Sequence, residues 1–169
     1  MHFMGKNDLT IEQLKIACRH VDELVSAGVS ENLAIRTLEV LTDTYAQTRT
    51  GGIPKVWSVN NIPHEQWSLA ALQAKKRKPR AKPGTYLRVE HGTPRRDFSK
   101  MIKKLNTSER LTEQSLADLI KKYWRMAVLT HEEDSRLGKS KTFKTPQERW
   151  ATAGIRFLKN SPNVVKRRT

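Results

Sequence analysis

The chain has 169 residues, of which 37% are hydrophobic, enough for one domain, or for one domain with a small helical attachment. Its single cysteine, Cys18, excludes an internal disulfide framework and a cysteine-built zinc site. No apolar run has the length needed to cross a bilayer, and the N-terminus lacks a signal-peptide core, so we expect a cytoplasmic protein without a membrane partner.

The formal net charge is +15, and it is distributed unevenly. Residues 1–74 carry six Lys and Arg against eight Asp and Glu, residues 75–104 carry twelve against two, and residues 105–169 carry fourteen against seven. The net charge is positive from Lys75 onward, which predicts a polyanionic partner for the second part of the chain, most often nucleic acid. A basic surface that serves only solubility is the alternative.

The first 50 residues predict a helical hairpin. Residues 10–27 and 30–48 each show apolar residues at helical spacing, with Thr10 and Ser30 as N-caps and Gly28 between the two helices. The apolar face of the second helix includes Leu33, Ala34, Leu38, Leu41 and Tyr45. This hairpin could pack on the rest of the chain or form a homodimer contact.

Residues 51–83 predict a connection, with at most a short strand around residues 55–59 and a helix that begins at Pro63 and stops at Pro79. The stretch "KKRKPRAK" at 75–82 contains six basic residues: Lys75, Lys76, Arg77, Lys78, Arg80 and Lys82. It could be a solvated arm, a helix end that complements its own dipole, or an arm that binds a polyanion.

The remaining residues, 84–169, predict an α+β core. Strands are expected at 85–90, 125–130 and 154–158, and helices after Thr93–Pro94, Thr112, Thr130 and Thr145. The fold class is therefore α+β, with a sheet of three to four strands covered by helices and an N-terminal helical hairpin. The connection between the first two strands is long enough for a helical crossover, so a parallel pair that brings both strand ends to one edge is permitted.

The stretch "VEHGTPRRDF" predicts a phosphate site at the first of these strand ends. His91 follows the strand, Gly92 permits an unusual backbone angle, and Thr93 caps the next helix. The free N–H groups of a helix N-terminus attract anions, and Arg95 and Arg96 add planar guanidinium groups that suit phosphate oxygens. Asp97 could instead pair locally with either arginine.

A second group of titratable residues occurs in "LTHEEDSRL". His131 begins a helix there, and Glu133 forms a capping box with Thr130, which by itself accounts for an acid at that position. The layout resembles the first strand end, however. Two histidines and a carboxylate at adjoining strand ends would suit acid–base cleavage of RNA, with arginine stabilising the charged phosphorane.

We therefore expect a nucleic-acid-binding protein that acts as a nuclease without a cofactor, with RNA the favoured substrate over DNA. The expected catalytic residues are His91, Arg95, Arg96, His131 and Glu133. The expected nucleic-acid-binding residues are Lys75, Lys76, Arg77, Lys78, Arg80, Lys82, Arg88 and Thr93.

Two alternatives stay open at this point. One is a non-catalytic nucleic-acid-binding or regulatory module that uses the same basic face. The other is a Mg²⁺-dependent DNA endonuclease with Glu90 and the Glu132–Asp134 acids as ligands. No nucleotide-binding glycine loop or regular histidine spacing for a metal is present in the sequence.

Overall fold

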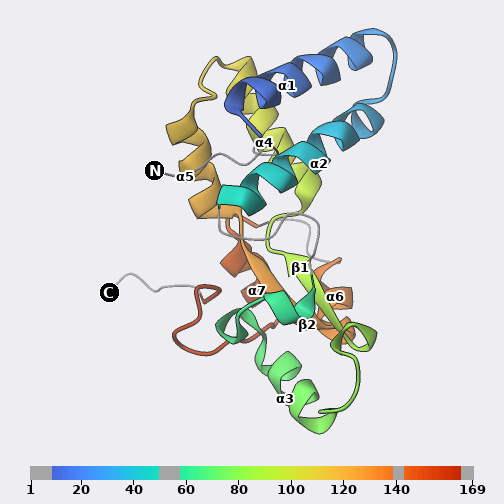
Figure 1. Cartoon of the computed structure of the whole chain (residues 1–169), viewed down its shortest axis with the longest axis vertical. Helices are drawn as coiled ribbons and strands as arrows, with labels where there is room; N and C mark the ends of the chain where they lie inside the picture. The colour runs from blue at the N-terminus through green and yellow to red at the C-terminus, as the bar shows by residue number, and fades with distance from the viewer. Residues whose placement is uncertain (1–8, 50–57, 139–142, 165–169) are drawn as a thin grey trace. The chain divides into compact units, whose positions relative to one another are not determined.

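The computed structural model describes residues 9–49, 58–138 and 143–164 (Figure 1). The chain forms two compact units that interleave along the sequence. Unit 1 comprises Met1–Lys55 and Pro94–Lys122, and unit 2 comprises Val56–Thr93 and Tyr123–Thr169. The predicted ranges 1–50, 51–83 and 84–169 follow the chain in order, whereas residues 94–122 leave unit 2 and return to it.

Unit 1 consists of helices. The predicted hairpin is present as α1 (Ile11–Ser26) and α2 (Glu31–Arg49), and α2 also packs against α4 (Arg95–Thr107). Thr10 and Gln13 form a full capping box on α1, and Gly28, with a φ of +92°, lies in the turn that follows. Thr112 precedes α5 (Glu113–Tyr123) and accepts a hydrogen bond from the Ser115 N–H, as an N-cap does.

One predicted residue on the apolar face of the second helix is exposed. Leu33 is 58% exposed, whereas Ala34, Leu38 and Tyr45 are buried together with Ile35 and Ala46. Residues 34, 35 and 38 recur at helical spacing, so the buried stripe of α2 begins one residue later than the sequence indicates.

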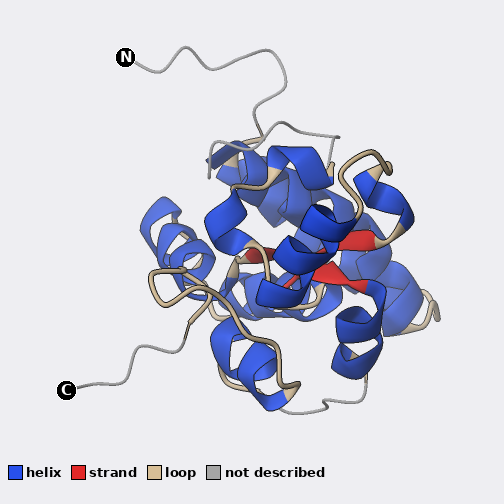
Figure 2. Ribbon diagram, turned by 90° about the horizontal axis from the view of Figure 1, so that it is seen from below, coloured by secondary structure: helices blue, strands red, loops and turns tan. Residues whose placement is uncertain are grey.

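Unit 2 contains a two-stranded antiparallel sheet of β1 (Leu87–His91) and β2 (Met126–Thr130), whose strands lie side by side in Figure 2. The α+β class is confirmed, but the sheet is smaller than the predicted three to four strands. His91 pairs with Met126 and Leu87 pairs with Thr130. The permitted parallel arrangement is wrong, because the chain enters β2 at the end where it left β1.

The third predicted strand, at residues 154–158, is reduced to a single bridge between Phe157 and Ser68. Trp67 makes a second bridge, to Val128. These two pairings hold Trp67 and Ser68 in extended backbone, so the helix predicted from Pro63 is split. A 3₁₀ turn covers His64–Gln66, and α3 (Leu69–Arg77) begins after the N-cap Ser68.

The predicted short strand at 55–59 is not present at its described end, because Val59 begins a 3₁₀ turn (Val59–Asn61). Residues 55–57 lie outside the described residues. A further 3₁₀ turn, Pro83–Thr85, leads into β1.

The core of unit 2 lies between β2 and the last two helices, α6 (His131–Leu137) and α7 (Pro146–Thr152). Its buried side chains are Ala127, Leu129, Leu137, Trp150, Ile155 and Phe157. The predicted capping box of Thr130 and Glu133 is present on α6, and Thr145 caps α7 by accepting from the Glu148 N–H. Across the described ranges, none of the helices combines the length and the apolar character required to span a membrane.

Candidate nucleic-acid interface

The six basic residues of Lys75–Lys82, here called the basic segment, form the C-terminal turn of α3 and the loop that follows it. Lys75, Lys76 and Arg77 occupy the last helical turn, where positive side chains complement the helix dipole. The loop is folded back on itself. The Ala81 N–H donates to the Lys78 carbonyl at 3.2 Å, and the Tyr86 hydroxyl donates to the same carbonyl at 3.3 Å.

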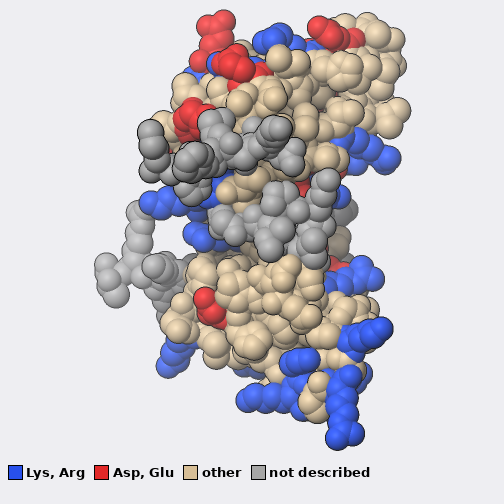
Figure 3. Space-filling view, viewed as in Figure 1, with Lys and Arg blue, Asp and Glu red and all other residues tan. Residues whose placement is uncertain are grey.

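The cationic groups of the basic segment are directed to solvent. Lys75 is half-buried and the other five residues are exposed. Among the residues that the structure describes, none of these six side chains makes an ion pair with an acid, and the Lys78 Nζ lies over the Tyr86 ring, 5.2 Å from its centre. Figure 3 shows Lys and Arg side chains gathered at the end of unit 2 where Figure 1 draws α3.

Unit 2 carries most of the charge of the chain. Its residues include 18 Lys and Arg against 6 Asp and Glu, a net of +12, whereas unit 1 has 14 against 11, a net of +3. Helix-end complementarity explains the position of three basic side chains in α3, but it does not explain Arg80 and Lys82 beyond the helix or the excess over the whole unit. Concentrated positive charge of this kind attracts polyanions.

The Gly92–Thr93 corner is packed inside unit 2. A Cβ atom at Gly92 would overlap Pro146 Cβ and lie 2.9 Å from the Trp150 ring, so Gly92 provides close approach to α7 rather than an unusual backbone angle. Thr93 is only 2% exposed, and its hydroxyl has no hydrogen-bond partner within the described chain. The expectation that Thr93 caps α4 is wrong, because Pro94 occupies the N-cap position and makes no side-chain cap.

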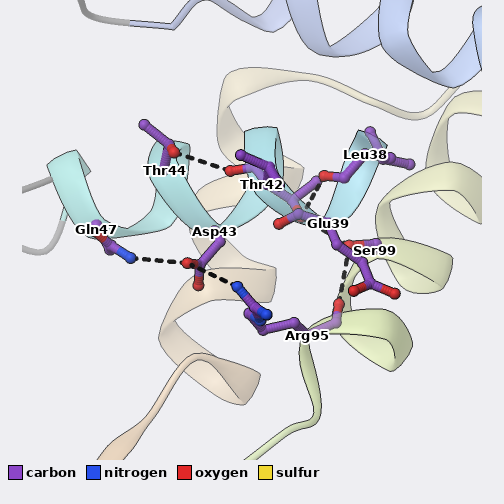
Figure 4. Close-up of polar contacts among 9 residues, drawn as sticks. Leu38, Glu39, Thr42, Asp43, Thr44, Gln47, Arg95 and Ser99 are labelled. Atoms are coloured by element: carbon purple, nitrogen blue, oxygen red, sulfur yellow. Dashed lines mark hydrogen bonds and ion pairs between the residues drawn. The ribbon is translucent and has the colours of Figure 1, made fainter. Parts of the chain in front are cut away.

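Arg95 and Arg96 face acids from α2 inside unit 1. Figure 4 shows Arg95 directed toward Asp43. The Arg96 Nε donates to Glu39 Oε1 at 3.0 Å, and the Arg95 Nη1 lies 3.8 Å from Asp43 Oδ2. Asp43 also accepts from the Gln47 amide at 2.9 Å, and Thr42 bonds to Ser99 of α4 at 2.8 Å. These arginines therefore join two helices of unit 1, while His91 belongs to unit 2.

The structure places the two predicted histidines at opposite ends of the sheet. His91 closes β1 beside Met126, and its ring meets Trp124 edge-on at 5.1 Å between centres. His131 is exposed at the start of α6, after Thr130, which pairs with Leu87. Four residues of antiparallel strand span about 14 Å. The sheet therefore does not place these two residues side by side, as adjoining parallel strand ends would have done.

Two acids named for the magnesium alternative are held by arginines of unit 2. The Arg149 Nη1 lies 3.3 Å from Glu90 Oε1, and the Arg88 Nη1 lies 3.5 Å from Asp134 Oδ2. Burial raises the pKa of Glu90, Arg149 opposes the rise, and Asp134 adds to it. Over the described ranges, no group of three or more His, Cys, Asp or Glu residues is arranged to hold a metal ion.

A hollow that the sequence did not reveal lies beside α3 in unit 2. It has a volume of about 310 Å³, and Gln73, Glu133, Arg136 and Arg156 contribute its polar lining. Gln73 lies one helical turn before Arg77, and Arg136 lies one turn after Glu133, so each pair shares a helix face. Arg156 joins them only through the tertiary structure, where its backbone carbonyl accepts from the Leu69 N–H at 2.8 Å.

Comparison of the chain with protein-family models, with curated proteins and with solved structures gives no match.

Proposed function

We propose that this protein is a non-catalytic nucleic-acid-binding module that contacts the phosphate backbone through the basic segment Lys75–Lys82. The observation that carries the proposal is a set of six cations, five of them exposed, that have no acidic partner among the described residues and belong to a unit with a net charge of +12. Lys and Arg side chains that neutralise phosphates release counterions, and this release drives binding.

The non-catalytic form is preferred to the nuclease because most of the expected catalytic groups have other roles or partners within their own unit. His91 and His131 lie at opposite ends of the sheet, and Glu133 belongs to a capping box. Arg95 and Arg96 have acidic partners in unit 1. Cleavage of RNA or DNA by the purified protein, with or without EDTA, would overturn the non-catalytic assignment.

Charge reversal tests the binding surface. We expect Lys75→Glu, Lys76→Glu, Arg77→Glu and Lys78→Glu together to weaken binding of a labelled oligonucleotide at least tenfold. The slope of log affinity against log salt should fall by about 3, because each lost phosphate contact removes about 0.7–0.9 from it. Fluorescence anisotropy over a salt series measures both quantities.

The matched control reverses four basic residues of unit 1: Lys104, Arg110, Lys121 and Lys122. This variant has the same net charge as the first, so it separates a local contact from general attraction. We expect it to keep most of the affinity and the slope. Equal weakening by both variants, or unchanged affinity of the first, would overturn the proposal.

A further inference from the structure

The hollow beside α3 is lined by the carboxylate of Glu133, whose two oxygens differ in their hydrogen bonding. Glu133 is only 4% exposed. Its Oε2 accepts from the Ser68 hydroxyl at 2.6 Å, from the Thr130 N–H at 3.0 Å and from the Thr130 hydroxyl at 3.3 Å. No hydrogen bond reaches Oε1 from any described residue, and Glu133 makes no ion pair there, although Arg136 lines the same hollow.

The other polar side chains that line the hollow, Gln73, Arg136 and Arg156, can all donate hydrogen bonds. Arg136 carries a buried Nε that has no hydrogen-bond partner among the described residues, and its Nη1 lies 3.4 Å from the exposed Glu132. The side chains of Gln73 and Arg156 are exposed. A buried carboxylate that lines a hollow together with two arginines suits a ligand that offers an N–H donor and a neighbouring anion.

The walls of the hollow also admit a flat group. Leu69 and Ala70 form an apolar side, and a Cβ at Gly154 would meet no atom within 4 Å. A volume of about 310 Å³ is at the small end of the range for ligand pockets, which is about 300–1,000 Å³. Proteins recognise the unpaired bases of single strands in pockets of this kind, by hydrogen bonds to the base edges and by stacking on the planes of arginine side chains.

The helix face that carries Gln73 of the hollow also carries residues of the basic segment. Gln73 lines the hollow, and Lys76 and Arg77 follow it at three and four residues. Side chains at these spacings are neighbours on a helix surface. A strand with one base in the hollow would therefore extend its phosphates toward the cations that the proposed function assigns to backbone contact.

We propose that this hollow binds one unstacked base of single-stranded nucleic acid and selects cytosine over uracil or thymine through Glu133 Oε1. The cytosine N4 amine donates to a carboxylate, whereas uracil and thymine present an O4 acceptor at that position. Arg136 and Arg156 contact the adjoining phosphates. This proposal rests on the proposed function, because it identifies the strand and the base that the same module takes.

The test compares oligocytidine with oligouridine of eight nucleotides, because the two strands carry equal charge. We expect the wild-type protein to bind the cytidine strand about 5–10-fold more tightly, which is at the lower end of one specific base contact. Glu133→Gln keeps an oxygen for Ser68 and Thr130 and puts an NH₂ group in place of Oε1. It should remove or reverse the preference, since that amide donates to O4 of uracil.

Glu132→Gln is the matched control, because it makes the same charge change at an exposed neighbour outside the hollow. It should leave the cytidine preference intact. If Glu133→Gln does not fold, judged by its circular dichroism, Ala70→Leu provides the second variant. Ala70 is an exposed residue of α3 that lines the hollow, so a larger side chain there should abolish the preference while the salt-dependent binding remains.

The outcomes separate the two proposals. Equal affinity of the wild-type protein for both strands, or a cytidine preference that survives Glu133→Gln and Ala70→Leu, would overturn base selection in the hollow while leaving backbone binding in place. Absence of salt-dependent binding to either strand would overturn the proposed function itself. Loss of the preference in both variants, with Glu132→Gln unchanged, supports the hollow as the base site.

Discussion

Arg149 and Glu90 form an ion pair inside unit 2, with 3.3 Å between Arg149 Nη1 and Glu90 Oε1. The same nitrogen donates to the carbonyls of His91 at 2.8 Å and Gly92 at 3.3 Å. The Arg149 side chain is 8% exposed and that of Glu90 is 26% exposed. One guanidinium group thus ties α7 to the end of β1, at the point where the chain leaves unit 2.

Removing Arg149 should destabilise the fold. We expect Arg149→Met to lower the free energy of unfolding by about 3 kcal/mol. The substitution leaves the partly buried carboxylate of Glu90 and the carbonyls of His91 and Gly92 without the hydrogen bonds that Arg149 donates. Urea unfolding followed by tryptophan fluorescence measures the change. Arg156→Met, an exposed arginine in the same unit, is the control and should change the free energy by less than about 0.5 kcal/mol. Similar values for both variants would contradict the structural role of Arg149.

Glu90 should make stability depend on pH. Burial raises its pKa from the ordinary value of 4.5, with Arg149 and His91 opposing the rise. The folded state then holds the proton more tightly than the unfolded state. Its contribution to stability is complete below pH 4.5 and is lost as the pH rises through the raised folded pKa.

Glu90→Gln removes this titration and keeps a carbonyl for Arg149. We therefore expect a flatter profile of unfolding free energy in the range just above pH 4.5, relative to the wild-type protein. Denaturant unfolding at a series of pH values provides the comparison. An identical slope in both proteins would show that Glu90 does not carry this dependence.

Gly92 should tolerate no side chain. Gly92→Ala forces a methyl group against Pro146 and Trp150, so we expect a loss of about 3 kcal/mol from overpacking. Gly84→Ala is the matched change, because a Cβ there meets nothing within 4 Å and the φ angle is not positive. The free energy of unfolding of Gly84→Ala should lie within about 1 kcal/mol of the wild-type value. Thermal unfolding distinguishes the two, and equal midpoints would refute the packing argument.

Cys18 should be inert in the folded protein. The residue is 0% exposed, and burial raises the pKa of its thiol to about 11, against a lowering by Lys103. The thiolate is the reactive form, so we expect no alkylation at pH 8 without denaturant and full alkylation in guanidinium chloride. Mass spectrometry counts the modified protein. Rapid native labelling would show that α1 opens away from its neighbours.

Local features of this protein follow directly from its sequence. The capping boxes of Thr10 with Gln13 and Thr130 with Glu133 involve residues three positions apart, and the structure contains both. The hairpin and the strands around Val89 and Val128 follow from apolar spacing in the same way. The charge asymmetry is also a property of composition, and it led to the proposed partner.

Only the tertiary structure decided how these elements meet. The antiparallel pairing separates His91 from His131, and the partner of Arg96 is Glu39, 57 residues away in the sequence. Arg156 reaches the hollow of Glu133 because Phe157 and Ser68 pair across the unit. Helix caps and apolar stripes arise within one or two turns of backbone, whereas charge neutralisation and pocket formation depend on side chains that the folded chain brings together from distant positions.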